Sequence, residues 1–529
     1  MKKIISVALA VLMLLPVLNL SVSAAVCTCD EIPIIYVKGR SSIYEDKSDP
    51  NSIDLPYVED GYIEAKVKEI LPVFAKAYLS DNYDEYCRVL TAAFSEVYSN
   101  FSPDENGNMP GNSGVRWSWS ESSLRDVHRG AVYEGGAECH EYIYRYMFEY
   151  DCRRAPVDIA DDLNEYIEAV KRVTGHDKVN IVSRCLGTCV ATAYVAEYGW
   201  EDIETFVMYN PTVNGTFVTN SLFSENISLD ADALDYFANQ QLGDETLMKF
   251  IKSTVSLANK TYGLNITSAV LNTVVEKVAR LAAPDIMKVS YGTMGGYWAM
   301  VADEYYAAAR EFVFSGEEEK YAVLLAKFDE YNENVGSKLE EIYTAMAADG
   351  VNMKIVAKYG YQLYPLNENA YEQSDMIITL AEQTFGATCA PFGEKLSAEY
   401  IEKAQSEGRG AYISADKCVD ASTALFPDTT WIIKDMKHNC FPHNTDVLLM
   451  KLFENHGSMT VADNPDYPQY LVYSGEENNG DTLLPMTEEN TGSETEHPSI
   501  FRLIIDFFKN LFALIKSFFA DKGLIPANA

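Results

Sequence analysis

The segment Lys178–Thr188 carries the residues best suited to nucleophilic chemistry. Val179–Val182 predicts a buried strand and the small residues after Gly187 predict a helix, so that Cys185 falls on the tight turn between them. Ser183 and Gly187, two positions before and after it, are small enough for the turn to close. A helix N-terminus lowers a thiol's pKa and stabilises an oxyanion. The segment therefore predicts a nucleophile elbow with Cys185 as the nucleophile; the alternative is a buried, inert thiol.

A cysteine nucleophile needs a base, and four of the seven histidines lie in the C-terminal third of the chain. His438 comes directly after the predicted strand Thr430–Lys434, in the loop position from which a histidine can reach an elbow. We therefore expect His438 to be the base. His443 is the second candidate.

A carboxylate must orient the imidazole, and three aspartates precede His438 at suitable places. Asp416 is followed by a short helical segment and then by the last strand, which is the order a triad requires. Asp416 is our first choice. Asp375 is a rival because it follows the predicted strand Val351–Tyr359 more directly, and Asp420 is third. Each of them could instead cap a helix, the usual role of an isolated aspartate.

An oxyanion hole next to Cys185 requires two backbone N–H groups. We expect one from Leu186 and one from Arg40, since the segment Lys38–Arg40 places a glycine in the loop after the first strand, Ile32–Val37. The cysteines, histidines and aspartates do not fall into the spacing of a zinc site, so we predict no metal. No nucleotide-binding loop is found, and we predict no cofactor.

Strand-like and helix-like segments alternate along the first part of the chain, which predicts a mostly parallel, doubly wound α/β sheet. Residues 216–350 break this alternation, because they show a succession of helical patterns without a strand. We therefore predict a large inserted helical cap that shapes a substrate pocket. The sheet domain is thus expected in two parts, 26–215 and 351–473.

Both ends of the chain differ from this domain. Residues 1–25 have a basic start, an apolar run and small residues at the end, which predicts a secretory signal peptide; a retained anchor is the alternative. Residues 474–499 are rich in Glu, Asn, Gly, Thr and Ser, as expected of a flexible acidic linker. Residues 500–520 predict an amphipathic C-terminal helix that lies on a membrane or cell-envelope partner, or else folds back onto the main domain.

The composition limits the class of partner. Lys and Arg number 42 and Asp and Glu 78, a net charge of −36, which argues against nucleic acid or an anionic membrane as a general electrostatic partner. The ten cysteines of an exported protein suggest some disulfides. Their pairing cannot be deduced; Cys27 with Cys29, Cys139 with Cys152 and Cys389 with Cys418 are candidates.

The chain resembles a known group, the lecithin–cholesterol acyltransferase-like lipases and acyltransferases of the α/β-hydrolase fold. Phe148–Arg153 resembles that group's Tyr-Asp-Trp-Arg strand end, with Cys152 in place of Trp. The stretch from Ala160 to Gly187 resembles its helix and elbow, and Val207–Gly215 resembles the following strand and turn. The group has Ser at the nucleophile and usually His before it, where this chain has Cys185 and Arg184. Dienelactone hydrolases, similar in fold, use Gly-x-Cys-x-Gly.

The resemblance implies an enzyme that processes esters or acyl groups, with its nucleophile at 185, its acid near 416 and its base at 438. We thus expect a secreted hydrolase of carboxylic esters, lipid-like acyl esters or lactones, working on a small-molecule ester or lipid through a Cys-His-Asp triad. The alternative is a catalytically inactive surface protein that binds a ligand or partner through its cap.

Overall fold

The computed structural model describes residues 31–59, 61–135, 143–224, 227–228, 268–475 and 482–492. The expected signal peptide, the expected C-terminal helix 500–520 and residues 225–226 and 229–267 of the expected cap lie outside these residues. Among the described helices, none combines the length and the apolar character that crossing a bilayer requires.

Eight strands form one sheet, in the spatial order β14-β13-β12-β7-β6-β5-β1-β4. All neighbours run parallel except β13 and β14, which pair antiparallel at one edge. In chain order the strands are β1 (Ile34–Val37), β4 (Tyr146–Phe148), β5 (Val179–Arg184), β6 (Ile203–Tyr209), β7 (Asn352–Tyr359), β12 (Thr430–Lys434), β13 (Tyr470–Ser474) and β14 (Thr482–Pro485). The sheet is thus α/β and mostly parallel, as predicted, and is compatible with an α/β-hydrolase fold.

Both faces of the sheet are buried, which explains why its central strands are almost continuously apolar. Along β1, Ile35 and Val37 pack in the same cluster as α5 (Pro156–Thr174) and α6 (Leu186–Tyr198). The alternate residues, Ile34 and Tyr36, pack on the opposite face with α17 (His443–Lys451). The period of two along the strand therefore divides its side chains between two helical layers.

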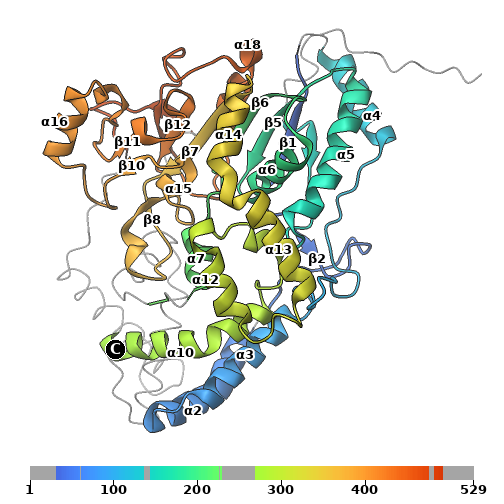
Figure 1. Cartoon of the computed structure of the whole chain (residues 1–529), viewed down its shortest axis with the longest axis vertical. Coiled ribbons are helices and arrows are strands. Elements are labelled where there is room, and N and C mark those ends of the chain that lie inside the picture. Colours follow the sequence, from blue (N-terminus) through green and yellow to red (C-terminus); the bar gives the residue numbers. More distant parts are fainter. Residues whose placement is uncertain are drawn as a thin grey trace, which may run out of the picture.

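Every described element between Phe217 and Ala348 is helical. Figure 1 shows α10 lying with α2 and α3 at the lower end of the molecule, while α12 and α13 lie between them and the sheet. The helices are α2 (Tyr62–Ser80), α3 (Asp84–Tyr98), α7 (Phe217–Leu222), α10 (Ser268–Val289), α11 (Gly295–Trp298), α12 (Asp303–Phe314), α13 (Ala322–Asn334) and α14 (Leu339–Ala348).

Several elements were missed or assigned otherwise from the sequence. The helix α4 (Glu121–Gly135) was not predicted, nor was β13. The linker prediction is wrong for Thr482–Pro485, because these residues form β14 and pair with β13. The polar composition around the strand concealed its two central leucines, Leu483 and Leu484.

Candidate active site

The turn between β5 and α6 holds Cys185 in a strained backbone conformation, with φ 50° and ψ −129°. A side chain at positive φ costs of the order of 1–3 kcal/mol and persists only where the surroundings impose it. Here Gly187 provides the reason for the tight turn. A Cβ at that position would lie 2.5 Å from the carbonyl oxygens of Val37 and Lys38, so only glycine lets α6 approach the end of β1. The predicted elbow therefore has the geometry that raises Cys185 above the sheet edge.

His438 is the histidine that contacts the elbow. Its Nε2 lies 3.3 Å from the Sγ of Cys185, although the two residues are 253 positions apart in the chain. Cys185 is half-buried, whereas His438 is buried in the loop that follows β12. His443, the second candidate, begins α17.

Asp375 is the carboxylate at this histidine. Its Oδ2 lies 2.7 Å from the Nδ1 of His438, and its Oδ1 accepts the backbone N–H groups of Ile377 and Ile378. Asp375 is fully buried and follows β9 (Gln373–Ser374). The rival of the sequence analysis is thus the residue that the fold brings to the imidazole.

The first choice for the acid, Asp416, is wrong. Its carboxylate pairs with Lys434 at 3.0 Å and accepts the hydroxyl of Tyr359 at 2.8 Å. Burial opposes ionisation of Asp416, but the charge of Lys434 and the hydrogen bonds outweigh it and hold its pKa below the ordinary value. Lys434 is the last residue of β12. Its amine binds the carboxylate of Asp416, which the chain order predicts for His438.

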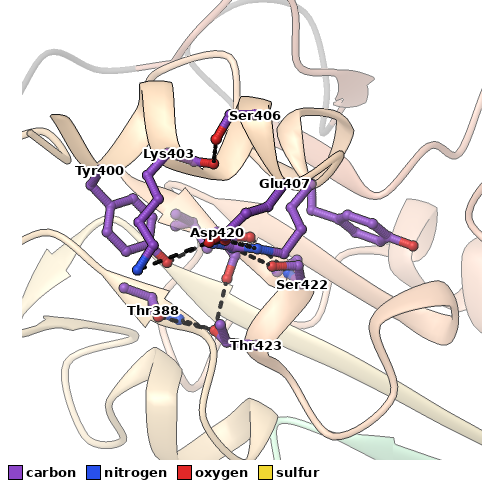
Figure 2. A network of polar contacts seen from close by, with 12 residues as sticks. Thr388, Tyr400, Lys403, Ser406, Glu407, Asp420, Ser422 and Thr423 are labelled. Carbon is purple, nitrogen blue, oxygen red and sulfur yellow. Dashed lines mark hydrogen bonds and ion pairs between the residues drawn. The ribbon is translucent and has the colours of Figure 1, made fainter. Parts of the chain in front are cut away.

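The third candidate, Asp420, is committed elsewhere as well. It accepts the Tyr400 hydroxyl at 2.9 Å, pairs with Arg409 and caps a short turn at Ser422. Figure 2 shows it at the centre of this polar network, with Tyr400, Ser422 and Thr423 around it. It therefore has the structural role that an isolated aspartate commonly has.

The charges of Cys185 and His438 stabilise each other. Burial raises the pKa of Cys185, but His438 and then Arg184 lower it further than burial raises it, so the pKa lies below that of an ordinary thiol. Burial lowers the pKa of His438, but Asp375 and Cys185 raise it to about 9. Both directions favour the pair of thiolate and imidazolium over the neutral pair, and the thiolate is the reactive form of a cysteine nucleophile.

The first residue of α6 and the loop after β1 both lie against the nucleophile. The backbone N–H of Leu186, the first residue of α6, contributes to lowering the pKa of Cys185. A Cβ on Gly39 would lie 3.2 Å from the Cβ of Cys185, so the loop that carries Arg40 runs against the nucleophile. The N–H of Lys38 is already bonded to the carbonyl oxygen of Phe148 at 3.1 Å.

Two further residues at the site were not predicted. Asn210, at φ 38° just after β6, places its side-chain amide 3.1 Å from the Nδ1 of His438. Lys358 on β7 is fully buried, and its Nζ donates to the carbonyl oxygens of His438 and Cys440 at 3.3 and 2.8 Å. Burial lowers the pKa of Lys358 to about 7. A polar residue at the carboxyl end of a central strand is the signal that could have identified both.

A cavity of about 810 Å³ lies beside this site rather than on it. Thr379, four residues beyond Asp375, lines it together with residues of α7, α12 and α15 (Leu380–Thr384). None of Cys185, His438 and Asp375 does so. Among the described residues, no three His, Cys, Asp or Glu side chains gather closely enough to hold a metal ion.

The described cysteines are thiols. Cys389 and Cys418, one of the candidate disulfides, are not bonded to each other, and Cys152 is also free. Cys27, Cys29 and Cys139 lie outside the described residues. Neither a protein-family model nor a curated protein matches this chain.

Proposed function

We propose that this protein is a hydrolase of carboxylic esters, lipid-like acyl esters or lactones that uses Cys185 as its nucleophile. The observation that carries the proposal is the continuous contact from Cys185 Sγ to His438 Nε2, at 3.3 Å, and from His438 Nδ1 to Asp375 Oδ2, at 2.7 Å. A nucleophile, a base and an orienting carboxylate in this order are the arrangement of acyl-transfer enzymes.

The reaction begins with attack of the Cys185 thiolate on the ester carbonyl carbon. The carbonyl oxygen becomes an oxyanion, which the N–H groups of Leu186 and Arg40 face in this scheme. His438, as imidazolium, protonates the leaving alkoxide when the carbon–oxygen bond breaks, and an acyl-thioenzyme remains. His438 then removes a proton from water, the hydroxide attacks the thioester, and the acid leaves as the thiolate is restored.

Asp375 keeps its charge throughout this cycle. Its two backbone donors, Ile377 and Ile378, and its burial fix the carboxylate against Nδ1, which sets the ring orientation and stabilises the imidazolium. A lactone would open by the same steps, with the leaving alkoxide still attached to the acyl group.

The finer assignment to lipases and acyltransferases rests on the sequence resemblance around the elbow. Cysteine in place of serine favours esters and lactones with a good leaving group over ordinary long-chain esters, because a thiolate leaves a tetrahedral intermediate more readily than an ordinary alkoxide does. We further propose that the protein is secreted, on the strength of residues 1–25, and that residues 500–520 contact a membrane or the cell envelope.

Turnover of a panel of p-nitrophenyl esters tests this proposal. The wild type is compared with Cys185→Ala and His438→Ala, and with two controls that remove a half-buried thiol and an exposed histidine elsewhere, Cys389→Ala and His456→Ala. Turnover that the two site variants lose and the two controls keep supports a cysteine hydrolase. Equal turnover in all five proteins, or none in the wild type, overturns it.

A further inference from the structure

The Nδ1 atom of His438 has two side-chain neighbours, and the proposed cycle uses only one of them. The Oδ2 of Asp375 lies 2.7 Å from this atom, and the side-chain Nδ2 of Asn210 lies 3.1 Å from it. Asn210 is fully buried, and its Oδ1 has no hydrogen-bond partner among the described residues. A buried amide that leaves its carbonyl oxygen unpaired and directs its nitrogen at an imidazole needs a physical explanation.

The main chain holds Asn210 in this place. Its φ of 38° lies in the left-handed region, which asparagine adopts more readily than most residues. Its N–H donates to the carbonyl oxygen of Val356 at 2.8 Å, and the carbonyl oxygen of the preceding Tyr209 accepts the N–H of Cys185 at 3.2 Å. The end of β6 therefore contacts the nucleophile through its backbone and the base through the side chain of Asn210.

The proton on Nδ1 decides which end of the amide is favoured next to the ring. In the neutral imidazole Nδ1 carries the proton that it donates to Asp375, and in the imidazolium both ring nitrogens carry protons. An N–H is therefore present at Nδ1 in both states of the proposed cycle. An amide N–H opposite this group is repelled by it, whereas an amide oxygen in the same place accepts the proton. A half-turn about the last side-chain bond exchanges the two ends of the amide, which are nearly equal in size.

We infer that Asn210 presents its Oδ1 to His438 and is a second acceptor for the Nδ1–H, beside Asp375. This inference rests on the proposed function, in which His438 alternates between imidazole and imidazolium. One N–H can be shared between two acceptors, and an acceptor stabilises a charged donor more than a neutral one. Asn210 is therefore a positioning residue, which fixes the plane of the ring and stabilises its charged form.

Two substitutions separate an acceptor from a donor at this position. Asn210→Asp has an oxygen at both ends of the side chain, so the Nδ1–H keeps an acceptor in either orientation. Asn210→Gly removes the acceptor, and glycine adopts a φ of 38° without strain. The other charged groups at the base are unchanged in both variants: Cys185 at Nε2, Asp375 at Nδ1, and Lys358 on the main-chain carbonyl oxygen.

The pKa of His438 is measured by NMR titration of protein labelled at its histidine nitrogens, and His438→Gln identifies the signal. We expect Asn210→Gly to lower this pKa by about one pH unit, because the imidazolium loses an acceptor. Asn210→Asp should keep the pKa at or above the wild-type value. A pKa that is unchanged or raised in Asn210→Gly overturns the inference. A pKa below the wild-type value in Asn210→Asp overturns it too, whether or not Asn210→Gly folds.

Asn180 provides the matched control. It is buried on β5, at the opposite end of that strand from Cys185. Its Oδ1 likewise has no partner within the described part of the chain, and its Nδ2 donates to the carbonyl oxygen of Ile32 at 3.4 Å. Asn180→Asp and Asn180→Gly should leave the pKa of His438 unchanged, even where they lower the stability of the protein. An equal fall of this pKa in Asn180→Gly overturns the inference, because a general loosening of the sheet would then explain both glycine variants.

The second arm compares p-nitrophenyl ester turnover across pH. In Asn210→Gly, kcat should fall by about tenfold, and the alkaline limb should move to lower pH together with the pKa of His438. Turnover whose alkaline limb has the same position in Asn210→Gly and the wild type overturns the inference and leaves the proposed function standing. A lowered pKa of His438 in Asn210→Gly, without ester turnover in the wild type, overturns the proposed function and leaves the contact between Asn210 and His438 standing.

Discussion

Asp375 and His438 are joined at two points. The carboxylate of Asp375 lies 2.7 Å from the Nδ1 of His438, and the backbone N–H of His438 donates to the carbonyl oxygen of Asp375 at 2.8 Å. The two loops that carry these residues are therefore held together by the main chain as well as by the side chains. This double contact fixes the imidazole before any substrate arrives, which is the preorganisation that acyl transfer requires.

Substitutions of Asp375 and Asp416, the two main candidates for the triad carboxylate, should have different effects on turnover and on stability. Asp375→Asn should lower ester turnover by about 10³-fold or more, because the amide no longer stabilises the imidazolium. Asp416→Asn should leave turnover near that of the wild type but reduce the free energy of unfolding by about 3–5 kcal/mol, since Lys434 would lose its buried partner. Steady-state kinetics and denaturant unfolding of both variants provide the comparison.

The pH dependence of the stability that Asp416 contributes provides a control. Its pKa is lowered on folding, so the stability it contributes is present above the unfolded-state pKa and is lost as the pH falls through the lower, folded-state pKa. The stability difference between wild type and Asp416→Asn should therefore shrink in acid. Turnover that falls in Asp416→Asn as far as in Asp375→Asn would contradict the assignment.

The rate of ester turnover should have a bell-shaped dependence on pH. The acid limb reports formation of the thiolate and lies below the ordinary thiol pKa, because the charge of His438 lowers the pKa of Cys185 more than burial raises it. The alkaline limb should lie near pH 9, where His438 loses the proton that the leaving group needs. A rate that rises steadily through pH 9 would show that no imidazolium takes part.

Lys358 should matter for the position of His438. Lys358→Met removes the donor to the carbonyl oxygens of His438 and Cys440, so we expect kcat to fall by about tenfold or more, because small misplacements of a catalytic group are costly. The matched control is Lys354→Met on the same strand, whose buried Nζ donates to the carbonyl oxygen of Met459 at 2.6 Å.

Both lysine variants should lose stability, but Lys354→Met should keep its kcat. Lys358→Arg, which retains a donor, should recover part of the lost rate. If Lys358→Met and Lys354→Met have the same kcat, Lys358 does not position His438, because the loss of a buried amine would then explain the effect of both substitutions.

Gly187 should tolerate no side chain. In Gly187→Ala the new methyl group would meet two carbonyl oxygens at 2.5 Å, so α6 would have to move away from β1. We expect a loss of about 1–3 kcal/mol of stability and loss of turnover. Gly475→Ala, whose nearest atom would lie 3.8 Å away, is the control that should change neither. Thermal unfolding and turnover of a Gly187→Ala protein that match the wild type would refute the elbow geometry.

Local patterns predicted the sheet well where a strand is buried on both faces. β5, β7 and β12 are short apolar runs, and the structure has them within a few residues of the predicted bounds. The edge strand β14 lacked this signal, because it is half-exposed and lies in a polar stretch. Its pairing depends on β13, a contact that no local pattern encodes.

The candidate site likewise contains residues that local patterns predict and one that they do not. Cys185 and His438 were predictable because each is placed by its neighbouring strand, at a turn whose residue types are restricted. Asp375 was only a rival, because it and Asp416 both lie in the long connection between β7 and β12. Which carboxylate reaches the histidine depends on how that connection folds and on Lys434 occupying Asp416. Such long-range pairing is absent from chain order.

Detection of an acyl group on Cys185 tests the central claim most directly. The purified protein would be mixed with p-nitrophenyl acetate, quenched in acid within the first turnover and mapped by peptide mass spectrometry. The account predicts an acetyl group on Cys185, formed more slowly in His438→Ala and absent in Cys185→Ala. Release of p-nitrophenol without acetylation of Cys185, or with the acetyl group on another residue, would contradict it.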